Sequence, residues 1–216
     1  DGYSDDLMRQ LGGVLGRVLK PGARAFMNFG QLKEGLNRPI EAHTHLMDGS
    51  GLHAQQCIIW VKSIALDGKQ RGHYQPINSP RLLNYCWEYL FQYTKGEEAA
   101  TPLDRLSIGV PFADKSNLER GTRGKNGDLH CGGDVWFIPY ATTGAQRKKR
   151  HRHAYPLELV ERCIKLAGLT PGDTVFDPFM GGGTTAIGAK GLGMNTYSYD
   201  VNAVSLKEAK QAWRLA

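Results

Sequence analysis

The segment from Thr174 to Asp200 constrains the fold of this 216-residue chain more than any other stretch. Residues 174–176 are β-branched or aromatic and predict a short buried strand. Three glycines follow at residues 181–183, where a backbone without Cβ can turn sharply and come close to a ligand. Residues 184–190 predict a helix that begins directly after these glycines, and residues 195–200 predict a second strand. The free N–H groups at the start of this helix would face a ligand above the first strand.

A carboxylate ends each of the two predicted strands. Asp177 ends the first, and Asp200 follows it 23 residues later at the end of the second. Nucleotide-binding βαβ units place a carboxylate at an interval of about 20 residues, where it binds ribose hydroxyls. No Gly-Lys-Ser or Gly-Lys-Thr follows the glycines, which disfavours a triphosphate, and the incomplete G-x-G-x-x-G pattern weakens the case for NAD or FAD. A purely structural turn is the alternative interpretation of the glycine cluster.

The net charge of +6 and the isoelectric point near 9.1 favour an acidic partner, of which nucleic acid is the common case. Hydrophobic residues make up 41% of the chain, yet no stretch is long and apolar enough to span a membrane. The four cysteines are scattered without a C-x-x-C pair, and Cys131 with His151 and His153 matches no standard metal-ligand spacing. We therefore expect a cytoplasmic protein without a bound metal or a membrane span.

Hydrophobic periodicity predicts alternating helices and strands in the first part of the chain. The predicted helices span residues 5–19 and 31–46, and the predicted strands span residues 23–29, 55–62 and the second half of 82–94. Tyr89, Phe91 and Tyr93 are expected on one face of the last strand. His43 and His45 are expected on a solvated helix face rather than as ligands.

Residues 96–150 have a different composition, in which glycine, asparagine, lysine, arginine and aspartate dominate and periodicity is lost apart from residues 135–138. Most of its positive charge comes from basic residues that include Arg123, Lys125, Arg147, Lys148, Lys149 and Arg150. A cationic, loop-rich segment suits contact with phosphate groups, which supply affinity but little sequence information. A solvated surface is the alternative interpretation.

Residues 177–185, with the sequence DPFMGGGTT, resemble the S-adenosylmethionine loop D-P-F-x-G-x-G-T-T of DNA methyltransferases that modify exocyclic amino groups of adenine or cytosine. Residues 17–22, RVLKPG, resemble the R-V-L-K-P-G-G segment of class I methyltransferases. Residues 153–164 resemble the family's H-P-x-x-F-P-x-x-L helix, with Ala154 in place of the first proline and Tyr155 as the aromatic residue. The order of these elements is similar to that of the β subgroup of amino-methyltransferases.

The resemblance implies an α/β fold of the class I methyltransferase (Rossmann-like) type. In that fold a mostly parallel sheet has helices on both faces, and here a loop-rich recognition segment is added. The resemblance also implies three parts: a catalytic half at residues 1–95, a target-recognition segment at residues 96–150 and a cofactor-binding half at residues 151–216.

The cofactor that the resemblance implies is S-adenosyl-L-methionine. The residues expected to bind it are Asp177, Pro178, Phe179, Gly181, Gly183, Thr184, Thr185, Asp200 and His153. Asp200 would hold the ribose hydroxyls, and Asp177 would orient the loop or contact the methionine amine. Thr184 and Thr185 would offer hydroxyl and N–H groups to the cofactor carboxylate. The glycines would permit close approach of the backbone.

Double-stranded DNA is the implied partner, contacted by the six basic residues of the 96–150 segment. In this family the loop that corresponds to residues 71–81 lies near the target base, and an extruded base needs flat apolar partners and hydrogen bonds to its edge. We therefore expect Tyr74 and Asn78, with His73, to contact DNA, and an ordinary surface loop is the alternative. A homodimer is compatible with the sequence, which does not fix the oligomeric state.

The catalytic loop of the family, Asp/Asn/Ser-Pro-Pro-Tyr/Phe/Trp, is absent from the 216 residues, in which no Pro-Pro occurs. The element order places this loop before Asp1, so no catalytic residue is visible and we expect the natural protein to extend upstream. The complete enzyme would transfer a methyl group from S-adenosylmethionine to N4 of cytosine or N6 of adenine. The alternatives are a catalytically inactive DNA-binding fragment, which the missing loop favours, and an RNA or protein methyltransferase of the same fold.

Overall fold

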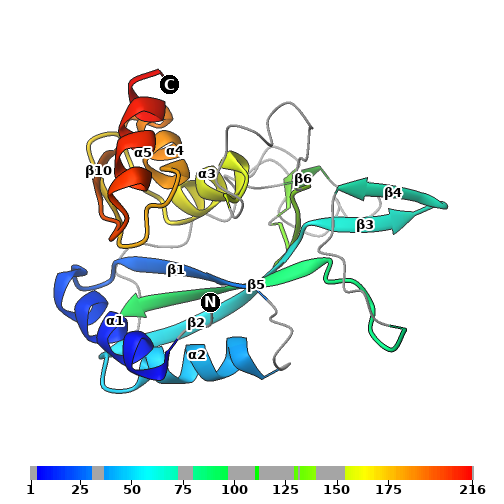
Figure 1. Cartoon of the computed structure of the whole chain (residues 1–216), viewed down its shortest axis with the longest axis horizontal. Helices are drawn as coiled ribbons and strands as arrows, with labels where there is room; N and C mark the ends of the chain where they lie inside the picture. The colour runs from blue at the N-terminus through cyan, green and yellow to red at the C-terminus, as the bar shows by residue number, and fades with distance from the viewer. Residues whose placement is uncertain are drawn as a thin grey trace. The chain divides into compact units, whose positions relative to one another are not determined.

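The computed structural model describes residues 4–30, 37–72, 80–96, 110–111, 129–130, 132–139 and 154–215 (Figure 1). The chain divides into two compact units. Unit 1 consists of Asp1–Pro102 and Asp134–Ala141, and unit 2 consists of Leu103–Gly133 and Thr142–Ala216. The three parts expected from the sequence, residues 1–95, 96–150 and 151–216, rest on the family resemblance and stay a prediction.

Unit 1 is built on a four-stranded sheet with the strand order β1-β5-β2-β8. Its strands are β1 (Arg24–Phe29), β5 (Trp87–Lys95), β2 (Leu52–Val61) and β8 (Val135–Phe137). β5 is antiparallel to both of its neighbours, and β8 is parallel to β2. In the described part of this sheet, antiparallel pairing thus outweighs the mostly parallel pairing expected from the sequence. The reason is that the described chain between β2 and β5 forms a hairpin rather than a crossover helix.

Two helices, α1 (Asp5–Val18) and α2 (Arg38–Met47), pack against each other on one side of this sheet (Figure 1). The buried residues of α1 share one face at helical spacing: Met8, Leu11, Gly12 and Leu15. Gly12 allows the close approach of the two helices, because a Cβ there would lie 2.0 Å from the carbonyl oxygen of Leu46. Gly12 of the first predicted helix therefore serves helix packing, whereas a Cβ at Gly16 would lie 1.9 Å from the carbonyl oxygen of Ser50, which follows α2.

The aromatic side chains of β5 lie on one face of the strand, as the sequence predicts. The rings of Tyr89 and Phe91 stack with centroids 5.6 Å apart, and Tyr93 follows at 6.4 Å from Phe91. His43 of α2 covers this ladder: its ring stacks on Phe91 at 4.4 Å, and its Nδ1 lies 2.8 Å from the hydroxyl oxygen of Tyr93. The expectation of a solvated His43 is therefore wrong, and burial lowers the pKa of this histidine.

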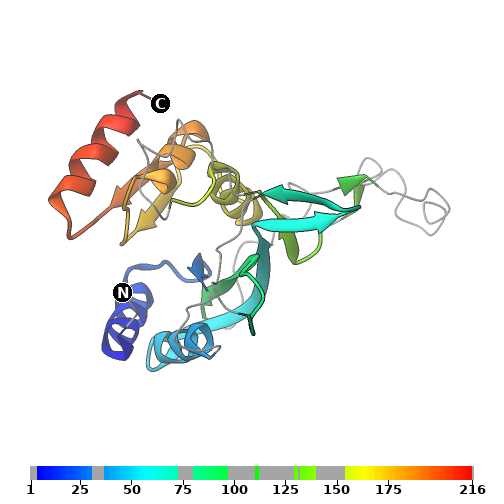
Figure 2. The same cartoon turned by 45° about the vertical axis from the view of Figure 1, so that its right-hand side comes forward.

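The segment between β2 and β5 contains a β-hairpin that the sequence analysis does not predict. Its strands, β3 (Ser63–Leu66) and β4 (Lys69–Gly72), extend away from the four-stranded sheet (Figure 2). Asp67 and Gly68 form the turn with φ values of 52° and 71°, the positive pair that a type I′ turn requires. Each strand has only four residues, which is too short for a clear alternating pattern.

Unit 2 contains the parallel strands β9 (Thr174–Asp177) and β10 (Asn195–Ser198) and the helices α3 (Leu157–Leu166), α4 (Thr184–Gly191) and α5 (Ala203–Leu215). It also contains the short antiparallel pair β6 (Val110–Pro111) and β7 (Leu129–His130). Val160 and Ile164 of α3 form a small core with Ala189 of α4. A Cβ at Gly188 would lie 2.9 Å from Val160 Cγ1, so this glycine permits the close packing of α3 on α4.

Most elements predicted by periodicity are confirmed. The strand–helix–strand unit at residues 174–200 is present, as are the helix at 5–19 and the strands at 23–29 and 55–62, with small shifts of their ends. The second helix begins at Arg38 within the described residues. No helix in the described ranges is both long and apolar enough to cross a membrane.

Candidate cofactor-binding site

The carboxyl ends of β9 and β10 lie side by side, because the two strands are parallel and pair Asp177 with Ser198. Backbone hydrogen bonds extend this pairing beyond the strands. The Tyr199 N–H donates to the Asp177 carbonyl oxygen at 2.9 Å, and the Met180 N–H donates to the Tyr199 carbonyl oxygen at 2.8 Å. The glycine turn, residues 181–183, is thereby held beside the segment that follows β10.

Asp200 lies directly at this turn. Its Oδ2 accepts a hydrogen bond of 2.8 Å from the Gly181 N–H, and its Oδ1 accepts one of 2.8 Å from the Asn202 N–H. The structure therefore brings together the two features that the sequence singles out, the glycine turn and the second carboxylate. A carboxylate has about four lone-pair sites, so each oxygen of Asp200 can accept a further hydrogen bond from a hydroxyl group.

The two outer glycines of the turn have different structural roles. Gly181 has a φ of 48°, and the nearest atom to a Cβ there would be the Phe179 carbonyl oxygen at 3.9 Å, so the space above it is open. Gly183 has a φ of 80°, and a Cβ there would lie 2.9 Å from the Cβ of Ala209 on α5. The open approach expected at both glycines is thus found at Gly181, whereas Gly183 makes room for α5.

The N-terminus of α4 points out of the glycine turn without a side-chain cap. Gly183 is the N-cap residue, and no acidic residue lies in the first turn of the helix. The first N–H groups of any helix lack intrahelical partners and carry the positive end of the helix dipole. Thr184 and Thr185 are half-buried at this end, where their N–H and hydroxyl groups suit an anionic ligand group.

Asp177 is the most deeply buried carboxylate of the site, with 9% of its surface exposed. Its Oδ1 accepts a hydrogen bond of 3.0 Å from the Phe179 N–H, whereas its Oδ2 is buried without a hydrogen-bond partner. Burial raises the pKa of this carboxyl, the Thr185 hydroxyl and the Phe179 N–H act in the opposite direction, and the nearby Asp200 charge raises it further. A buried carboxylate oxygen without a hydrogen-bond partner suits a cationic ligand group.

Tyr155 supports Thr185 from the start of α3. Its hydroxyl oxygen lies 2.5 Å from Thr185 Oγ1, and burial together with the charge of Asp177 raises the pKa of the phenol. The tyrosine remains protonated at neutral pH and can donate to Thr185 Oγ1, which leaves the threonine proton free for Asp177. Local sequence patterns do not assign Tyr155 to the site, although Tyr155 is the aromatic residue that resembles the one in the H-P-x-x-F-P pattern.

The chemical character of these groups matches the charged and hydroxyl groups of S-adenosylmethionine. Its methionine part carries an ammonium and a carboxylate, and its nucleoside part carries ribose hydroxyls. The unpaired Oδ2 of Asp177 suits the ammonium, the N-terminus of α4 suits the carboxylate, and Asp200 suits the hydroxyls. Within the described ranges, no three His, Cys, Asp or Glu side chains come together to hold a metal ion.

The remaining residues of the predicted sites are placed as follows. Pro178 is half-buried, and Phe179 is 51% exposed at the turn. The predicted residues outside the described ranges are His153, His73, Tyr74, Asn78, Arg123, Lys125, Arg147, Lys148, Lys149 and Arg150, so their roles stay predictions.

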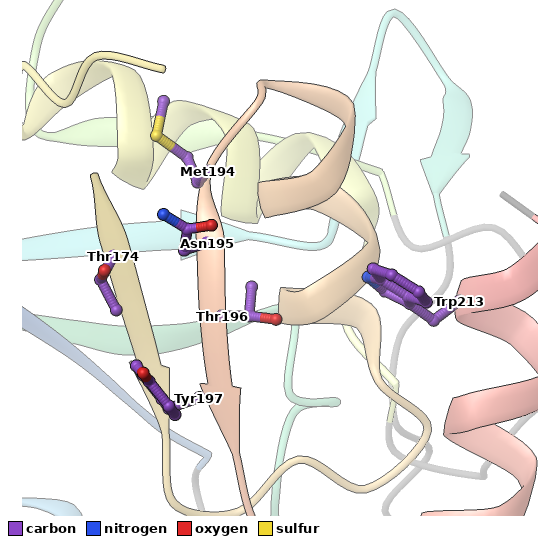
Figure 3. A pocket seen from close by; sticks show the side chains of 6 residues that line it. All are labelled: Thr174, Met194, Asn195, Thr196, Tyr197 and Trp213. Carbon is purple, nitrogen blue, oxygen red and sulfur yellow. The ribbon is translucent and has the colours of Figure 1, made fainter. Parts of the chain in front are cut away.

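A hollow of about 360 Å³ lies elsewhere in unit 2 (Figure 3). It is lined by Thr174, Met194, Asn195, Thr196, Tyr197 and Trp213. Figure 3 shows Thr174 on β9, Asn195 to Tyr197 along β10, and the Trp213 ring on α5. Thr174 and Asn195 begin their strands, whereas the carboxylates of the candidate site follow the carboxyl ends. This hollow is therefore separate from the glycine turn.

The fold of the chain is that of the class I methyltransferases. The solved structure of the M1.HpyAVI–SAM complex matches 95% of this chain and 81% of its own, with a TM-score of 0.64 and 19% sequence identity. The chain belongs to the DNA methylase family N6_N4_Mtase, whose sequence profile matches residues 3–211.

Curated relatives are similar over most of the chain. The type II methyltransferase M.BglII of Bacillus subtilis is 28% identical over 191 residues, which cover 85% of this chain and 49% of the relative. The type II methyltransferase M1.MboII of Moraxella bovis is 31% identical over 167 residues, which cover 74% of this chain and 62% of the relative. The chain thus spans about half to two thirds of the length of these relatives.

Proposed function

We propose that this chain is part of a DNA amino-methyltransferase that moves a methyl group from S-adenosyl-L-methionine to N4 of cytosine or N6 of adenine. The observation that carries the proposal is the placement of Asp200 and the glycine turn at the carboxyl ends of two parallel strands. Ligands of open α/β folds bind at this edge. Membership in the DNA methylase family supports DNA over RNA or protein as the substrate.

Each part of the site has one task in this proposal. Asp200 accepts hydrogen bonds from the ribose hydroxyls, and the N-terminus of α4 holds the methionine carboxylate. Asp177 Oδ2 pairs with the methionine ammonium. S-adenosylmethionine supplies an electrophilic methyl group on a sulfonium centre. The protein accelerates its transfer chiefly by fixing the position of the cofactor relative to the target amino group.

Binding of the ammonium should lower the pKa of Asp177. Burial and the neighbouring Asp200 disfavour its ionised form in the free protein, and a cation beside Oδ2 reverses that effect. Cofactor binding should therefore release protons as pH falls toward the raised pKa of this carboxyl. Calorimetric titrations in two buffers with different ionisation enthalpies measure this release directly.

DNA is the proposed partner, and the cytoplasm is the proposed location because such an enzyme acts where the DNA is. The net charge of +6 and the basic residues of the 96–150 segment support contact with a polyanion. A homodimer stays a hypothesis, which light scattering of the full-length protein decides.

The test of the proposal combines cofactor binding with product analysis. Full-length protein is titrated with S-adenosylmethionine and then incubated with duplex DNA, which is digested to nucleosides and analysed by mass spectrometry. The proposal predicts cofactor binding and the appearance of N4-methylcytosine or N6-methyladenine, which also identifies the target base. Cofactor binding without either product would leave only the cofactor part of the proposal standing, and absence of cofactor binding would refute it.

A further inference from the structure

Two buried polar atoms of unit 2 have no hydrogen-bond partner within the described part of the chain. One is Asp177 Oδ2, and the other is the hydroxyl oxygen of Ser198. Burial of a polar atom without a partner costs free energy, so such atoms are rare in native proteins and each one calls for an explanation. The proposed function accounts for Asp177 Oδ2 through the cofactor ammonium, but it gives Ser198 no task.

Ser198 and Asp177 lie next to each other at the carboxyl ends of β10 and β9. They are partners in the parallel register of the two strands, and partners in a sheet point their side chains to the same face. Neighbouring strands lie about 4.8 Å apart, a separation that rotation of a serine side chain between its staggered rotamers can bridge. The two atoms are also complementary, because a hydroxyl donates a hydrogen bond and a carboxylate oxygen accepts two.

The face that Ser198 and Asp177 share is the one that α4 covers. Val175, two residues before Asp177 on β9, packs against the core formed by α3 and α4. The Thr185 hydroxyl, at the start of α4, forms a hydrogen bond that favours the ionised form of Asp177. The Ser198 hydroxyl is therefore buried on the side of the sheet where the cofactor site lies.

The charge environment of Asp177 makes a further hydrogen-bond donor valuable. The titratable groups of the described chain that act on or face this carboxyl are Asp200, after β10, and Tyr155, before α3. The buried residues of α5, Ser205 and Ala209, carry no charge. Among the described groups, no cation thus favours ionisation of Asp177. Its charged form depends on hydrogen bonds until a cationic ligand arrives.

We propose that Ser198 is a positioning residue of the cofactor site, whose hydroxyl turns to Asp177 Oδ2 and donates to it when the cofactor ammonium binds. This inference rests on the proposed function and deepens it. Oδ2 has two lone-pair sites, so it accepts the ammonium and the hydroxyl together. The hydrogen bond stabilises the ionised carboxylate that the ammonium requires. Ser198 thus acts on the cofactor through Asp177.

A buried water that bridges Ser198 and Asp177 is the structural alternative. Such a water would satisfy both atoms in the cofactor-free protein, and the hydroxyl would then stabilise the fold whether or not the cofactor is present. The two explanations differ in their effect on the free protein. Removal of a hydroxyl without a partner leaves stability unchanged or raises it, whereas removal of a bridged hydroxyl lowers it.

The experiment is calorimetric titration of the full-length protein with S-adenosylmethionine, at neutral pH and in two mildly acidic buffers with different ionisation enthalpies. The test variant is Ser198→Ala, alone and combined with Asp177→Asn. The matched control is Thr196→Val, which removes a hydroxyl two residues earlier on β10, in the hollow away from the glycine turn (Figure 3). Urea denaturation of each cofactor-free variant measures its stability.

Ser198→Ala should bind the cofactor about tenfold more weakly, as expected for the loss of a hydrogen bond to a charged group. In mildly acidic buffer it should also release fewer protons on binding, because Asp177 ionises less readily in the complex. In the Asp177→Asn background the same change should have little further effect. Thr196→Val should match the wild type in affinity and proton release, and the urea midpoint of Ser198→Ala should not fall.

Wild-type affinity in Ser198→Ala would overturn the inference, as would an equal loss of affinity with and without Asp177→Asn. Weaker binding with unchanged proton release would also overturn it. A lower urea midpoint of Ser198→Ala would overturn it in favour of a bridging water. In each of these cases the wild-type protein still binds the cofactor, and the proposed function stands. A wild-type protein that binds no S-adenosylmethionine would refute the proposed cofactor site itself.

Discussion

The backbone N–H of Gly181 and Oδ2 of Asp200 lie 2.8 Å apart, and this hydrogen bond joins the glycine turn to the end of β10. The residue that gives the turn its open face is therefore tied to the carboxylate proposed to hold the ribose. The second oxygen of Asp200 is fixed by the Asn202 N–H. A carboxylate held on both sides loses little freedom when a ligand binds, which is the purpose of a preorganised site.

The two outer glycines should differ in their response to alanine. Gly183→Ala combines a φ of 80° with a Cβ 2.9 Å from Ala209 Cβ, so we expect it to lower the free energy of unfolding by about 3 kcal/mol. Gly181→Ala meets no close atom and should cost about 1 kcal/mol through its φ of 48°. Urea denaturation measures both. An added Ala209→Gly should restore part of the loss at Gly183, and an equal cost at both positions would contradict the packing role.

Replacing Asp177 should raise stability and weaken cofactor binding at the same time. Because burial raises the pKa of this carboxyl above 3.8, the folded state binds its proton more tightly than the unfolded state does. The stability that this tighter proton binding contributes is fully present below pH 3.8. It is lost as the pH rises through the raised pKa of Asp177 in the folded state. Asp177→Asn should therefore raise the free energy of unfolding at neutral pH by about 1 kcal/mol.

The affinity of the same variant for S-adenosylmethionine should fall, because the ammonium loses its carboxylate. Calorimetric titration and urea denaturation, each at neutral and acidic pH, measure the two effects. A destabilised Asp177→Asn protein, or one with wild-type affinity, would contradict the assignment of Oδ2 to the ammonium.

The Tyr155 hydroxyl should contribute to cofactor binding through Thr185. Tyr155→Phe removes the 2.5 Å contact to Thr185 Oγ1 and should cost about 1 kcal/mol of stability, with a few-fold loss of cofactor affinity. Thr185→Ser keeps the hydroxyl and serves as the control, with near wild-type affinity. If Tyr155→Phe loses stability but no affinity, the tyrosine supports only the packing of α3.

His43 should make unit 1 less stable in acid. Burial lowers the pKa of His43 below 6.5, so the unfolded chain takes up a proton here before the folded chain does. The stability that the neutral ring contributes is fully present above pH 6.5. It is lost as the pH falls through the lowered pKa of His43 in the folded state. His43→Gln removes the titrating ring and should flatten this part of the pH profile in urea denaturation. An unchanged profile would show that other groups control the acid sensitivity.

The sequence predicts those elements whose local pattern agrees with their environment. The strand, glycines, helix and second strand of residues 174–200 each have a local signal, and the interval between Asp177 and Asp200 predicts that both carboxylates lie at the same edge. The structure confirms this arrangement because parallel pairing of β9 and β10 places both strand ends together.

Features that depend on contacts distant in sequence could not be predicted in this way. The role of Gly183 depends on Ala209 of α5, and the burial of His43 depends on Phe91 and Tyr93 of β5. The link from Tyr155 to Thr185 joins α3 to α4 across 30 residues. Each is fixed by tertiary packing, which has no local periodicity to reveal it.

The central claim is that Asp200 binds the ribose hydroxyls of S-adenosylmethionine, and calorimetric titration of Asp200→Ala tests it. The matched control is Asp173→Ala, which removes a carboxylate that accepts a 2.8 Å hydrogen bond from the Thr170 N–H before β9 begins. Because Asp200 also holds the Gly181 N–H, each protein is titrated a second time with an analogue that lacks the ribose hydroxyls. The comparison of the two ligands isolates the ribose contact.

The account predicts that Asp200→Ala binds the cofactor ten- to a hundredfold more weakly, as expected for about 1.5–3 kcal/mol from hydrogen bonds to a charged group. The analogue should bind wild type and Asp173→Ala more weakly than the cofactor does, and Asp200→Ala should not distinguish the two ligands. An Asp200→Ala protein that keeps wild-type affinity, or that still discriminates between the ligands as strongly as the wild type, would contradict the account.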